Sequence, residues 1–239
     1  MKIKNNMKKY LFEKELISGL IKSRPNRFIM LVEIHGKIEK CHCPSTGRIG
    51  NIEFKDILCL LSISKNNARK TKYTVEAIIL EKNRIVGINQ TKANSYIEFF
   101  LQNNFLKKMI DVKELKREVK LNNSRIDFLV NTDCFLEIKT LLMHAPFGNK
   151  KHKTKFNSFE RLGRHFKEIS FQIKKGQRAI VLLCYLYDAK EFKVPKESNA
   201  EIAKIVKKAT ARGLENWQIN LKVDKNGVSL IDYFKLNLF

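Results

Sequence analysis

The sequence predicts two domains of different class, a small all-β domain over residues 1–88 followed by an α/β domain over residues 89–239. In the first part, short apolar runs alternate with turn residues, which is typical of a small barrel or sandwich. In the second part, apolar strand-like runs alternate with helical patterns, which is typical of an α/β fold around a mixed sheet. The stretch "VGINQTKANS" breaks the β pattern between them, so we place the domain boundary there.

Four β-rich runs are expected in the first domain. Their spacing suggests a small barrel or a sandwich, which periodicity alone does not separate, and a five-stranded barrel of the oligonucleotide-binding (OB) type would fit the length of the segment. The runs are "FIMLVEI", "KIEKCHC", "DILCLLSIS" and "YTVEAIILEK", at residues 28–34, 37–43, 56–64 and 73–82.

The second domain is expected to begin with a helix over "SYIEFFLQNNFLKKMI", which has apolar residues at helical spacing. "RAIVLLCYLY" is almost continuously apolar and therefore predicts a central strand that is covered on both faces. Capping residues and glycines bound two further helices. The expected order after the first helix is a strand at 114–121, a hairpin at 124–140, a helix at about 158–175, the central strand at 178–187, a helix at 198–213 and a strand–turn–strand unit at 215–233.

The stretch "SRIDFLVNTDCFLEIKT", residues 124–140, reads as a hairpin that carries carboxylates inside its apolar runs. With "NTD" as a three-residue loop, residues whose numbers sum to 264 face one another, which places Asp127 opposite Glu137. Facing like charges destabilise a strand pair, so we expect compensation by Arg125 and Lys139 in cross-strand ion pairs, or by a bound divalent cation. The opposite face is expected to be buried and carries Ile126, Phe128, Val130, Cys134, Leu136 and Ile138.

An acidic residue followed about ten residues later by Glu-x-Lys is typical of a site where two carboxylates bind Mg²⁺ or Mn²⁺ and an ammonium orients the attacking water. Here these residues are Asp127, Glu137 and Lys139, which we expect to be catalytic. A third metal-binding carboxylate could come from Glu98 on the preceding helix, which we favour, or from Glu118 on the preceding strand.

Composition points to a polyanionic partner. The net charge is +23, from 47 basic and 24 acidic residues, and it is shared between the first 90 residues (18 basic, 8 acidic) and the rest (29 basic, 16 acidic). Such an excess is typical of proteins that bind nucleic acid. The chain has neither an apolar run long enough to span a membrane nor the apolar core of a signal peptide, so we expect a cytoplasmic protein without a membrane partner.

Several basic residues are candidates for phosphate contacts, mainly in the loop "HAPFGNKKHKTKFN" and the helix after it. A solvated charge run is the alternative interpretation of that loop. In "CPSTGR", hydroxyl and backbone N–H groups in a turn could also hold a phosphate, although an ordinary barrel loop explains them equally well. The candidate nucleic-acid-binding residues are Arg48, Arg125, Lys151, Lys153, Arg161, Arg164 and His165.

The five cysteines are odd in number and irregular in spacing, which favours reduced thiols over a disulfide framework. "CHC" at residues 41–43 has no second Cys/His pair at finger-like spacing. We therefore interpret these cysteines as core or loop thiols.

The motifs "HCPSTGR", "VGINQT", "REVKLNNSRIDFLV", "FLEIKT", "ERLGRHFKEI" and "GQRAIVLLCYL" occur in an order and spacing that resembles the sugar fermentation stimulation protein A (SfsA) family. The resemblance implies an N-terminal OB-like barrel, a C-terminal domain like the PD-(D/E)XK nucleases, and DNA binding. It matches the nuclease Asp to Asp127 and the Glu-x-Lys to Glu137 and Lys139. The sequence departs from the family pattern in "STG" for "NTG" and in "TKFNSFERLGRHF", which lacks an acidic residue of that segment.

The leading hypothesis from the sequence is a nucleic-acid-binding protein with a Mg²⁺-dependent or Mn²⁺-dependent phosphodiesterase (nuclease) site. The alternative is a non-catalytic DNA-binding regulator connected with sugar metabolism, as the family name suggests, because a nuclease fold can serve as a binding module. A module that binds RNA through the barrel is a third hypothesis.

Overall fold

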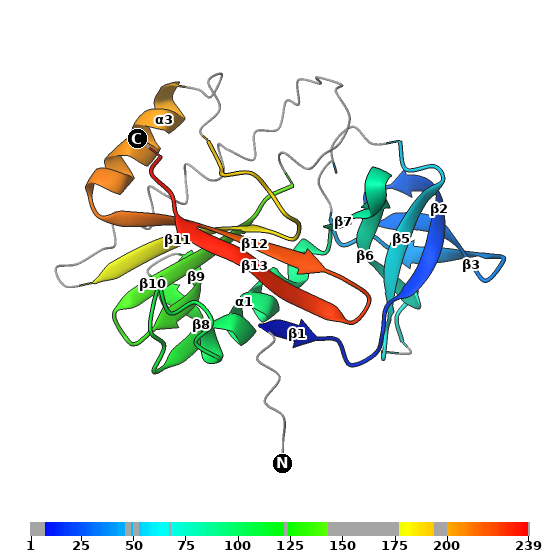
Figure 1. Cartoon of the computed structure of the whole chain (residues 1–239), viewed down its shortest axis with the longest axis horizontal. Coiled ribbons are helices and arrows are strands. Elements are labelled where there is room, and N and C mark those ends of the chain that lie inside the picture. Colours follow the sequence, from blue (N-terminus) through cyan, green and yellow to red (C-terminus); the bar gives the residue numbers. More distant parts are fainter. Residues whose placement is uncertain are drawn as a thin grey trace, which may run out of the picture.

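The structure is a computed structural model that describes residues 8–45, 49, 53–66, 68–121, 124–142, 177–193 and 200–238. It contains two sheets, one of six strands and one of seven. Figure 1 shows them side by side, with the smaller sheet formed by the first part of the chain. The expected combination of an OB barrel and a mixed α/β domain is confirmed.

The smaller sheet closes into a barrel. Five strands follow one another in the order β4-β3-β2-β5-β6, and β4 also pairs with β6, which closes the ring. Apolar residues alternate inward along β3, where Met30, Val32 and Ile34 are buried. Closure decides between the barrel and the sandwich, which the sequence pattern left open. The strands are β2 (Ile17–Asn26), β3 (Ile29–Ile34), β4 (Lys37–His42), β5 (Ile57–Ile63) and β6 (Tyr73–Leu80), with β7 (Arg84–Gly87) added beside β6.

The strand β2 has no counterpart among the four runs expected from the sequence. Its ten residues, "ISGLIKSRPN", include Gly19 and Pro25 and do not read as an apolar strand. Gly19 is required by packing, since a Cβ atom there would lie 2.5 Å from Val32 Cγ1 and 2.9 Å from Leu61 Cδ1. Close approach of the neighbouring strands, and not local preference, therefore places this segment in the barrel.

The larger sheet has the order β1-β13-β12-β11-β10-β9-β8. Its centre, β10-β11-β12, is parallel, and the remaining pairs are antiparallel. The central strand predicted from "RAIVLLCYLY" is β11, which is buried along nearly its whole length. The strands are β1 (Lys9–Leu11), β8 (Leu115–Leu121), β9 (Ser124–Val130), β10 (Cys134–Thr140), β11 (Arg178–Tyr185), β12 (Leu214–Val223) and β13 (Gly227–Lys235).

One strand lies in a different domain from the one expected. Residues 1–88 were assigned to the barrel, but β1 pairs with β13 at the edge of the larger sheet. Lys9 reinforces this pairing, because its ammonium lies 2.7 Å from the Asp224 carboxylate in the turn before β13. Three residues are too few for a sequence pattern to identify their partner strand.

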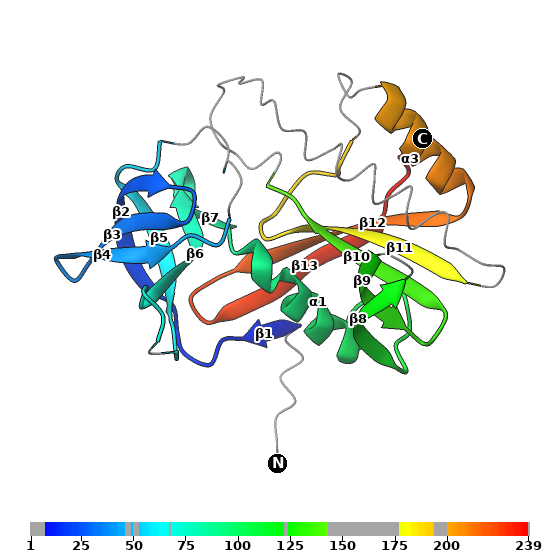
Figure 2. The same cartoon turned by 180° about the vertical axis from the view of Figure 1, so that it is seen from behind.

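Helices cover the larger sheet on opposite faces. The helix α1 (Ala93–Gln102) packs Tyr96 and Phe100 against one face, whereas α3 (Ala200–Ala211) packs Val206 and Ala209 on the other. Figure 2 shows α1 in front of the larger sheet, near β1 and β8, and α3 at the end of the sheet away from the barrel. The predicted first helix was longer, but α1 ends at Gln102, before "NNF", where Asn104 takes a positive φ of 54°. Two short 3-10 turns, Glu81–Asn83 and Gln90–Lys92, complete the described elements.

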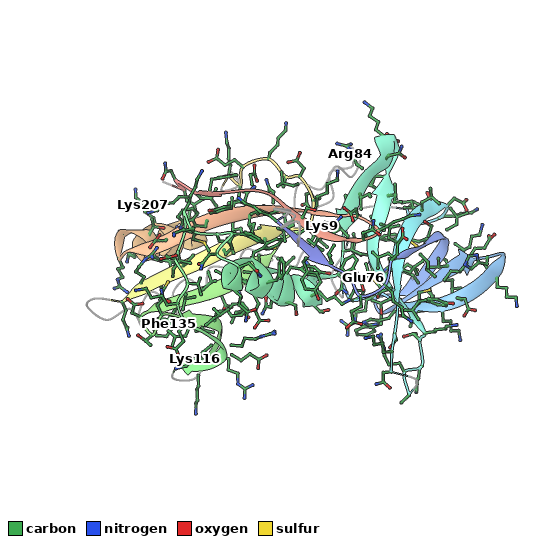
Figure 3. All side chains as sticks on the ribbon, turned by 60° about the horizontal axis from the view of Figure 1, so that its bottom comes forward. Lys9, Glu76, Arg84, Lys116, Phe135 and Lys207 are labelled. Carbon is green, nitrogen blue, oxygen red and sulfur yellow. The ribbon has the colours of Figure 1, made fainter. Side chains whose placement is uncertain are left out.

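Basic side chains lie on the outside of both domains, as the even division of charge along the chain predicts. Figure 3 shows Arg84 projecting from the barrel, and Lys116 and Lys207 projecting from the α/β domain. All three are exposed. No helix in the described ranges is long and apolar enough to cross a membrane.

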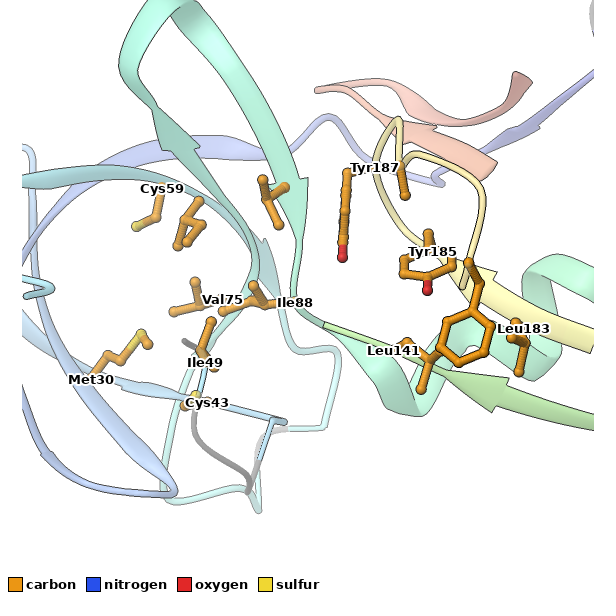
Figure 4. Close-up of a cluster of buried hydrophobic side chains, with 14 of the residues drawn as sticks. Met30, Cys43, Ile49, Cys59, Val75, Ile88, Leu141, Leu183, Tyr185 and Tyr187 are labelled. Atoms are coloured by element: carbon orange, nitrogen blue, oxygen red, sulfur yellow. The ribbon is translucent and has the colours of Figure 1, made fainter. Parts of the chain in front are cut away.

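One apolar core runs from the barrel into the α/β domain. Figure 4 shows it extending from Met30 and Val75 inside the barrel to Leu141 and Tyr185 at the end of the sheet. Gly87 makes the close contact between the two, because a Cβ atom there would lie 2.6 Å from the Leu186 Cβ. Its N–H donates to the Leu186 carbonyl at 2.9 Å. All five cysteines are buried and free.

Candidate functional site

The paired carboxylates lie where β9 and β10 separate. Backbone pairing joins Val130 with Cys134, Leu129 with Phe135, and Phe128 with Leu136, so the predicted register, in which residue numbers sum to 264, is confirmed. The expected apolar residues of the hairpin are all buried, but they belong to two cores: Ile126, beyond the last backbone pair, packs in the core that contains Val206 of α3, whereas the other five pack in the core under α1, namely Phe128, Val130, Cys134, Leu136 and Ile138.

Beyond the last backbone pair, carboxylates take the place of backbone acceptors. Asp127 Oδ2 accepts the N–H of Ile138 at 2.7 Å, and the N–H of Asp127 donates to Glu137 Oε2 at 3.3 Å. The two acidic residues therefore face one another across the end of the hairpin, as the register predicted. Their oxygens satisfy backbone N–H groups that a longer antiparallel pair would have used.

Glu137 and Lys139 act as one unit on β10. The Glu137 side chain is only 5% exposed, and the Lys139 ammonium contacts its Oε1. Since residues two apart on a strand point to the same face, this contact follows from the Glu-x-Lys spacing. Lys139 itself is 21% exposed, so its charge remains accessible from solvent.

Ion pairs among the described residues differ from those of a purely structural hairpin. Lys139 pairs with Glu137 on its own strand instead of with Asp127 on the partner strand. Arg125, one of the candidate phosphate contacts, lies 3.6 Å from Glu118 and is largely exposed. Lys139 is thus a cation in direct contact with the carboxylate pair.

Asn94 is a site residue that the sequence analysis missed. Its Nδ2 donates to Asp127 Oδ1 at 2.7 Å, which holds the carboxylate from the side of α1. Asn94 lies one helical turn before Glu98, the residue favoured as a third metal ligand. The sequence therefore indicated the face of the helix that meets Asp127, but it selected Glu98 on that face instead of Asn94. An Asn near the start of a helix gives no signal of its own, because such residues are common there.

The two candidates for a third carboxylate are engaged elsewhere. Glu98 binds Arg117 of β8 at 3.0 Å, and Glu118 binds Arg125 near the solvent. Across residues 8–142 and 177–238, as far as they are described, no three acidic, His or Cys side chains form a group that could hold a metal ion. The described site therefore offers two carboxylates and one amide.

Burial and mutual repulsion disfavour ionisation of the Asp127 carboxyl beside Glu137. Burial raises the pKa of the Asp127 carboxyl above its ordinary value, and the negative charge of Glu137 raises it further. The N–H of Ile138, the Asn94 amide and the Lys139 charge act in the opposite direction. The site thus carries a carboxylate whose ionisation costs free energy in the folded protein.

Ser45 is connected to the site by hydrogen bonds. Ser45 is buried, and its hydroxyl donates to the Ile88 carbonyl at 2.6 Å. Gln90, which Ser45 also contacts, donates from Nε2 to the Thr140 carbonyl at 3.2 Å, directly after Lys139. Ser45 thus has structural partners that account for its burial.

Of the residues predicted to contact phosphate, Arg125 lies within the part of the chain that the structure describes. It is exposed. The others lie outside the described residues, as do the basic loop and the helix expected at 158–175: Arg48, Lys151, Lys153, Arg161, Arg164 and His165.

Comparisons with known proteins agree with the two-domain architecture. A family model described as the SfsA N-terminal OB domain matches residues 23–88, and one described as the sugar fermentation stimulation protein RE domain matches residues 91–227. A sugar fermentation stimulation protein homolog of Clostridium beijerinckii is 29% identical over 223 residues, covering 91% of this chain and 96% of the relative. A homolog from Actinobacillus succinogenes is 30% identical over 203 residues, covering 81% and 84%.

A solved structure shares the complete fold. The structure of Pyrococcus furiosus SfsA in complex with Ca²⁺ aligns with a TM-score of 0.76 over 98% of this chain and 99% of that chain, at 21% sequence identity.

Proposed function

The chain belongs to the sugar fermentation stimulation protein family, and from this premise we propose that it binds nucleic acid and cleaves it at a divalent-metal-dependent phosphodiesterase site of the PD-(D/E)XK type. The observation that carries the proposal is the meeting of Asp127, Glu137 and Lys139 at the end of the β9–β10 hairpin. Two facing carboxylates with an adjacent ammonium are the groups that metal-assisted phosphoryl transfer needs.

The donor set fits Mg²⁺ or Mn²⁺. Mg²⁺ commonly uses one or two protein carboxylates and completes its shell with water and substrate phosphate, so a third carboxylate is not required. Asp127 and Glu137 would hold the cation, and its charge would offset both the burial and the repulsion from Glu137 that raise the pKa of Asp127. The relative from Pyrococcus furiosus is described as a complex with Ca²⁺, which is also a hard cation with oxygen ligands.

The residues of the site then have distinct parts in the reaction. A bound divalent cation would supply Lewis-acid stabilisation of the phosphate. Asn94 and the N–H of Ile138 hold the Asp127 carboxylate in one orientation, which keeps the two acidic side chains in place before substrate arrives. Lys139 keeps a positive charge beside Glu137, where it can orient the attacking water or offset charge that develops on the phosphoryl oxygens.

The alternative function is a non-catalytic DNA-binding regulator. The observation that favours it is the hydrogen bonding of Asp127, because each carboxylate oxygen already accepts an N–H group at 2.7 Å. A carboxylate held this way can also be a structural acceptor that joins α1 to the hairpin. The family name links the chain to sugar metabolism, which is compatible with either function.

A cleavage assay separates these functions. Purified protein is incubated with single-stranded, duplex and branched DNA and RNA, with Mg²⁺, with Mn²⁺ or with chelator. We expect metal-dependent cleavage that falls at least about 100-fold in Glu137→Gln. The matched control is Glu98→Gln, which makes the same chemical change on α1 and is expected to retain activity. Binding without cleavage of any substrate by the wild type would favour the regulator.

Binding itself is tested by its dependence on salt. The positive charge of both domains predicts contacts mainly to phosphates, so affinity should fall steeply between about 50 and 200 mM salt and vary little with base sequence. Neutralising Lys151, Lys153 and Arg164 together should weaken binding and reduce the salt dependence. If affinity does not respond to salt, phosphate contacts are not the source of binding.

A further inference from the structure

A polar cavity lies at the barrel, and its walls include neither Asp127 nor Glu137. Its volume is about 860 Å³, within the range of small-molecule sites. The walls come from the N-terminal segment at 10–16, from the ends of β4, β5 and β6, and from residues 89–92. The side chains that the ligand would meet include Arg69, Lys14, Glu76, Thr74, Tyr10 and Phe12.

The cavity contains a buried carboxylate, Glu76, whose side chain is only 1% exposed. Ser62 Oγ donates to it, Asn89 Nδ2 donates to Oε2 at 2.7 Å, and the Lys92 ammonium lies 3.1 Å from Oε1. Figure 3 shows Glu76 where the barrel meets the α/β domain. A carboxylate can accept about four hydrogen bonds and these three groups fill three of them, so Glu76, as part of the cavity wall, has one acceptor position left for a ligand hydroxyl.

The outer part of the cavity is cationic. Among the described residues no carboxylate lies within ion-pair distance of Lys14 or Arg69, although the charge of Lys14 acts on Glu13, which pairs with the neighbouring Lys65. Burial, together with the charge of Arg69, lowers the pKa of His42. The basic side chains at the entrance, Lys14, Lys65 and Arg69, outnumber the one acidic side chain there, Glu13, which favours an anionic group over a cation.

An aromatic wall completes the cavity. The rings of Tyr10 and Phe12 meet edge to face with centroids 6.2 Å apart, and Tyr10 packs against Tyr96 of α1 at 5.1 Å. These contacts hold the two rings in place beside the polar groups. Fixed aromatic side chains commonly bind the apolar face of a sugar or a base.

We propose that this cavity binds a phosphate ester of a hydroxylated ring of mononucleotide size. The phosphate lies at Arg69 and Lys14, a sugar hydroxyl donates to Glu76, and the ring packs against Tyr10 and Phe12. The same chemistry occurs in a free nucleotide and in the terminal nucleotide of a strand. The proposal does not depend on the proposed nuclease function, because none of these residues belongs to the Asp127–Glu137 pair.

The test measures binding of adenosine 5′-monophosphate, adenosine and inorganic phosphate to the full chain by calorimetry. We expect the nucleotide to bind at least about tenfold more tightly than either part alone, because it uses both ends of the cavity. Arg69→Gln should weaken nucleotide binding about tenfold or more. The matched control is Arg84→Gln, which removes the same charge from an exposed position of β7 outside the cavity and should change binding less than about twofold.

A Glu76 variant and a competition experiment test the hydroxyl contact and the source of the ligand. Glu76→Gln keeps the shape of the side chain and should weaken the nucleotide more than it weakens inorganic phosphate; if this variant does not fold, the two arginine variants decide. A 5′-phosphorylated oligonucleotide that competes with the nucleotide identifies a strand end as the source of the ligand, and absence of competition identifies a free nucleotide. Equal binding of nucleotide and inorganic phosphate, or equal losses in both arginine variants, would overturn the proposal.

Discussion

Glu76 in the barrel and the Asp127–Glu137 pair in the α/β domain are both buried acidic sites, but their charges are balanced in different ways. Glu76 receives a hydroxyl, an amide and an ammonium. Asp127 also receives two N–H groups, yet burial raises its pKa and the charge of the facing Glu137 raises it further. The donors around Glu76 therefore compensate its charge, whereas ionising Asp127 beside Glu137 costs free energy that a bound cation would offset.

Burial of an acidic residue does not by itself identify a metal site. What distinguishes the pair is a second carboxylate at close range. Measurements of stability and of metal binding can test this distinction before any nucleic-acid substrate is known.

The largest effect on stability is expected at Glu76. In Glu76→Ala the buried Asn89 amide and the Lys92 ammonium lose their acceptor, and we expect a loss of about 3 kcal/mol, the lower end for a broken buried pair, because Lys92 is 45% exposed. Urea denaturation measures this loss. The matched control is Glu13→Ala, whose exposed pair with Lys65 should contribute little to stability. Equal losses in the two variants would contradict the assigned role of Glu76.

Added metal should stabilise the folded protein through the pair. A ligand that binds only the folded state contributes RT ln(1 + [L]/Kd), which is about 2.7 kcal/mol at one hundred times Kd. We expect Mg²⁺ or Mn²⁺ to raise the midpoint of thermal unfolding of the wild type and to raise it less in Asp127→Asn and Glu137→Gln. In Glu98→Gln the increase should equal that of the wild type. A wild-type midpoint that is the same in chelator and in excess metal would argue for a structural hairpin.

Asn94 should tune metal affinity without being required for folding. Asn94→Ala removes the amide that orients Asp127, and loss of such an outer hydrogen bond typically weakens metal binding about 10-fold to 100-fold. Isothermal titration with Mn²⁺ measures the change. Asn103→Ala serves as a control at the other end of α1, where the side chain bonds the Phe99 carbonyl. An unchanged metal affinity in Asn94→Ala would mean that Asp127 keeps its orientation without the amide.

The smallest effect is the pH dependence of the metal-free protein. The folded-state pKa of Asp127 is raised, so its contribution to stability is present below the unfolded pKa, about 3.9, and is lost as the pH rises through the folded pKa. Without metal, Asp127→Asn should therefore match the wild type at low pH and become equally or more stable as the pH increases. The measurement is denaturant unfolding in chelator across this range. A variant that becomes less stable than the wild type with increasing pH would indicate that Asp127 is a net attractive partner.

Much of the hairpin could be predicted because its rules are local. The three-residue turn and the two-residue period define the register, the buried face and the common direction of Glu137 and Lys139. The same period identified β3, β4, β5 and β6 within a residue or two of their observed ends. These features depend on neighbours in the chain, so a pattern in the sequence is enough to identify them.

The remaining features depend on residues that are distant in the chain. Asn94 contacts Asp127, and Glu98 binds Arg117, only because α1 packs against the larger sheet near β8 and β9. The pairing of β1 with β13 and the closure of the barrel through β4 and β6 likewise join segments that no local period relates. The sequence alone therefore established the facing carboxylates and their lysine, whereas packing between distant segments selected Asn94 as their partner, because contacts of this kind exist only once the chain has folded.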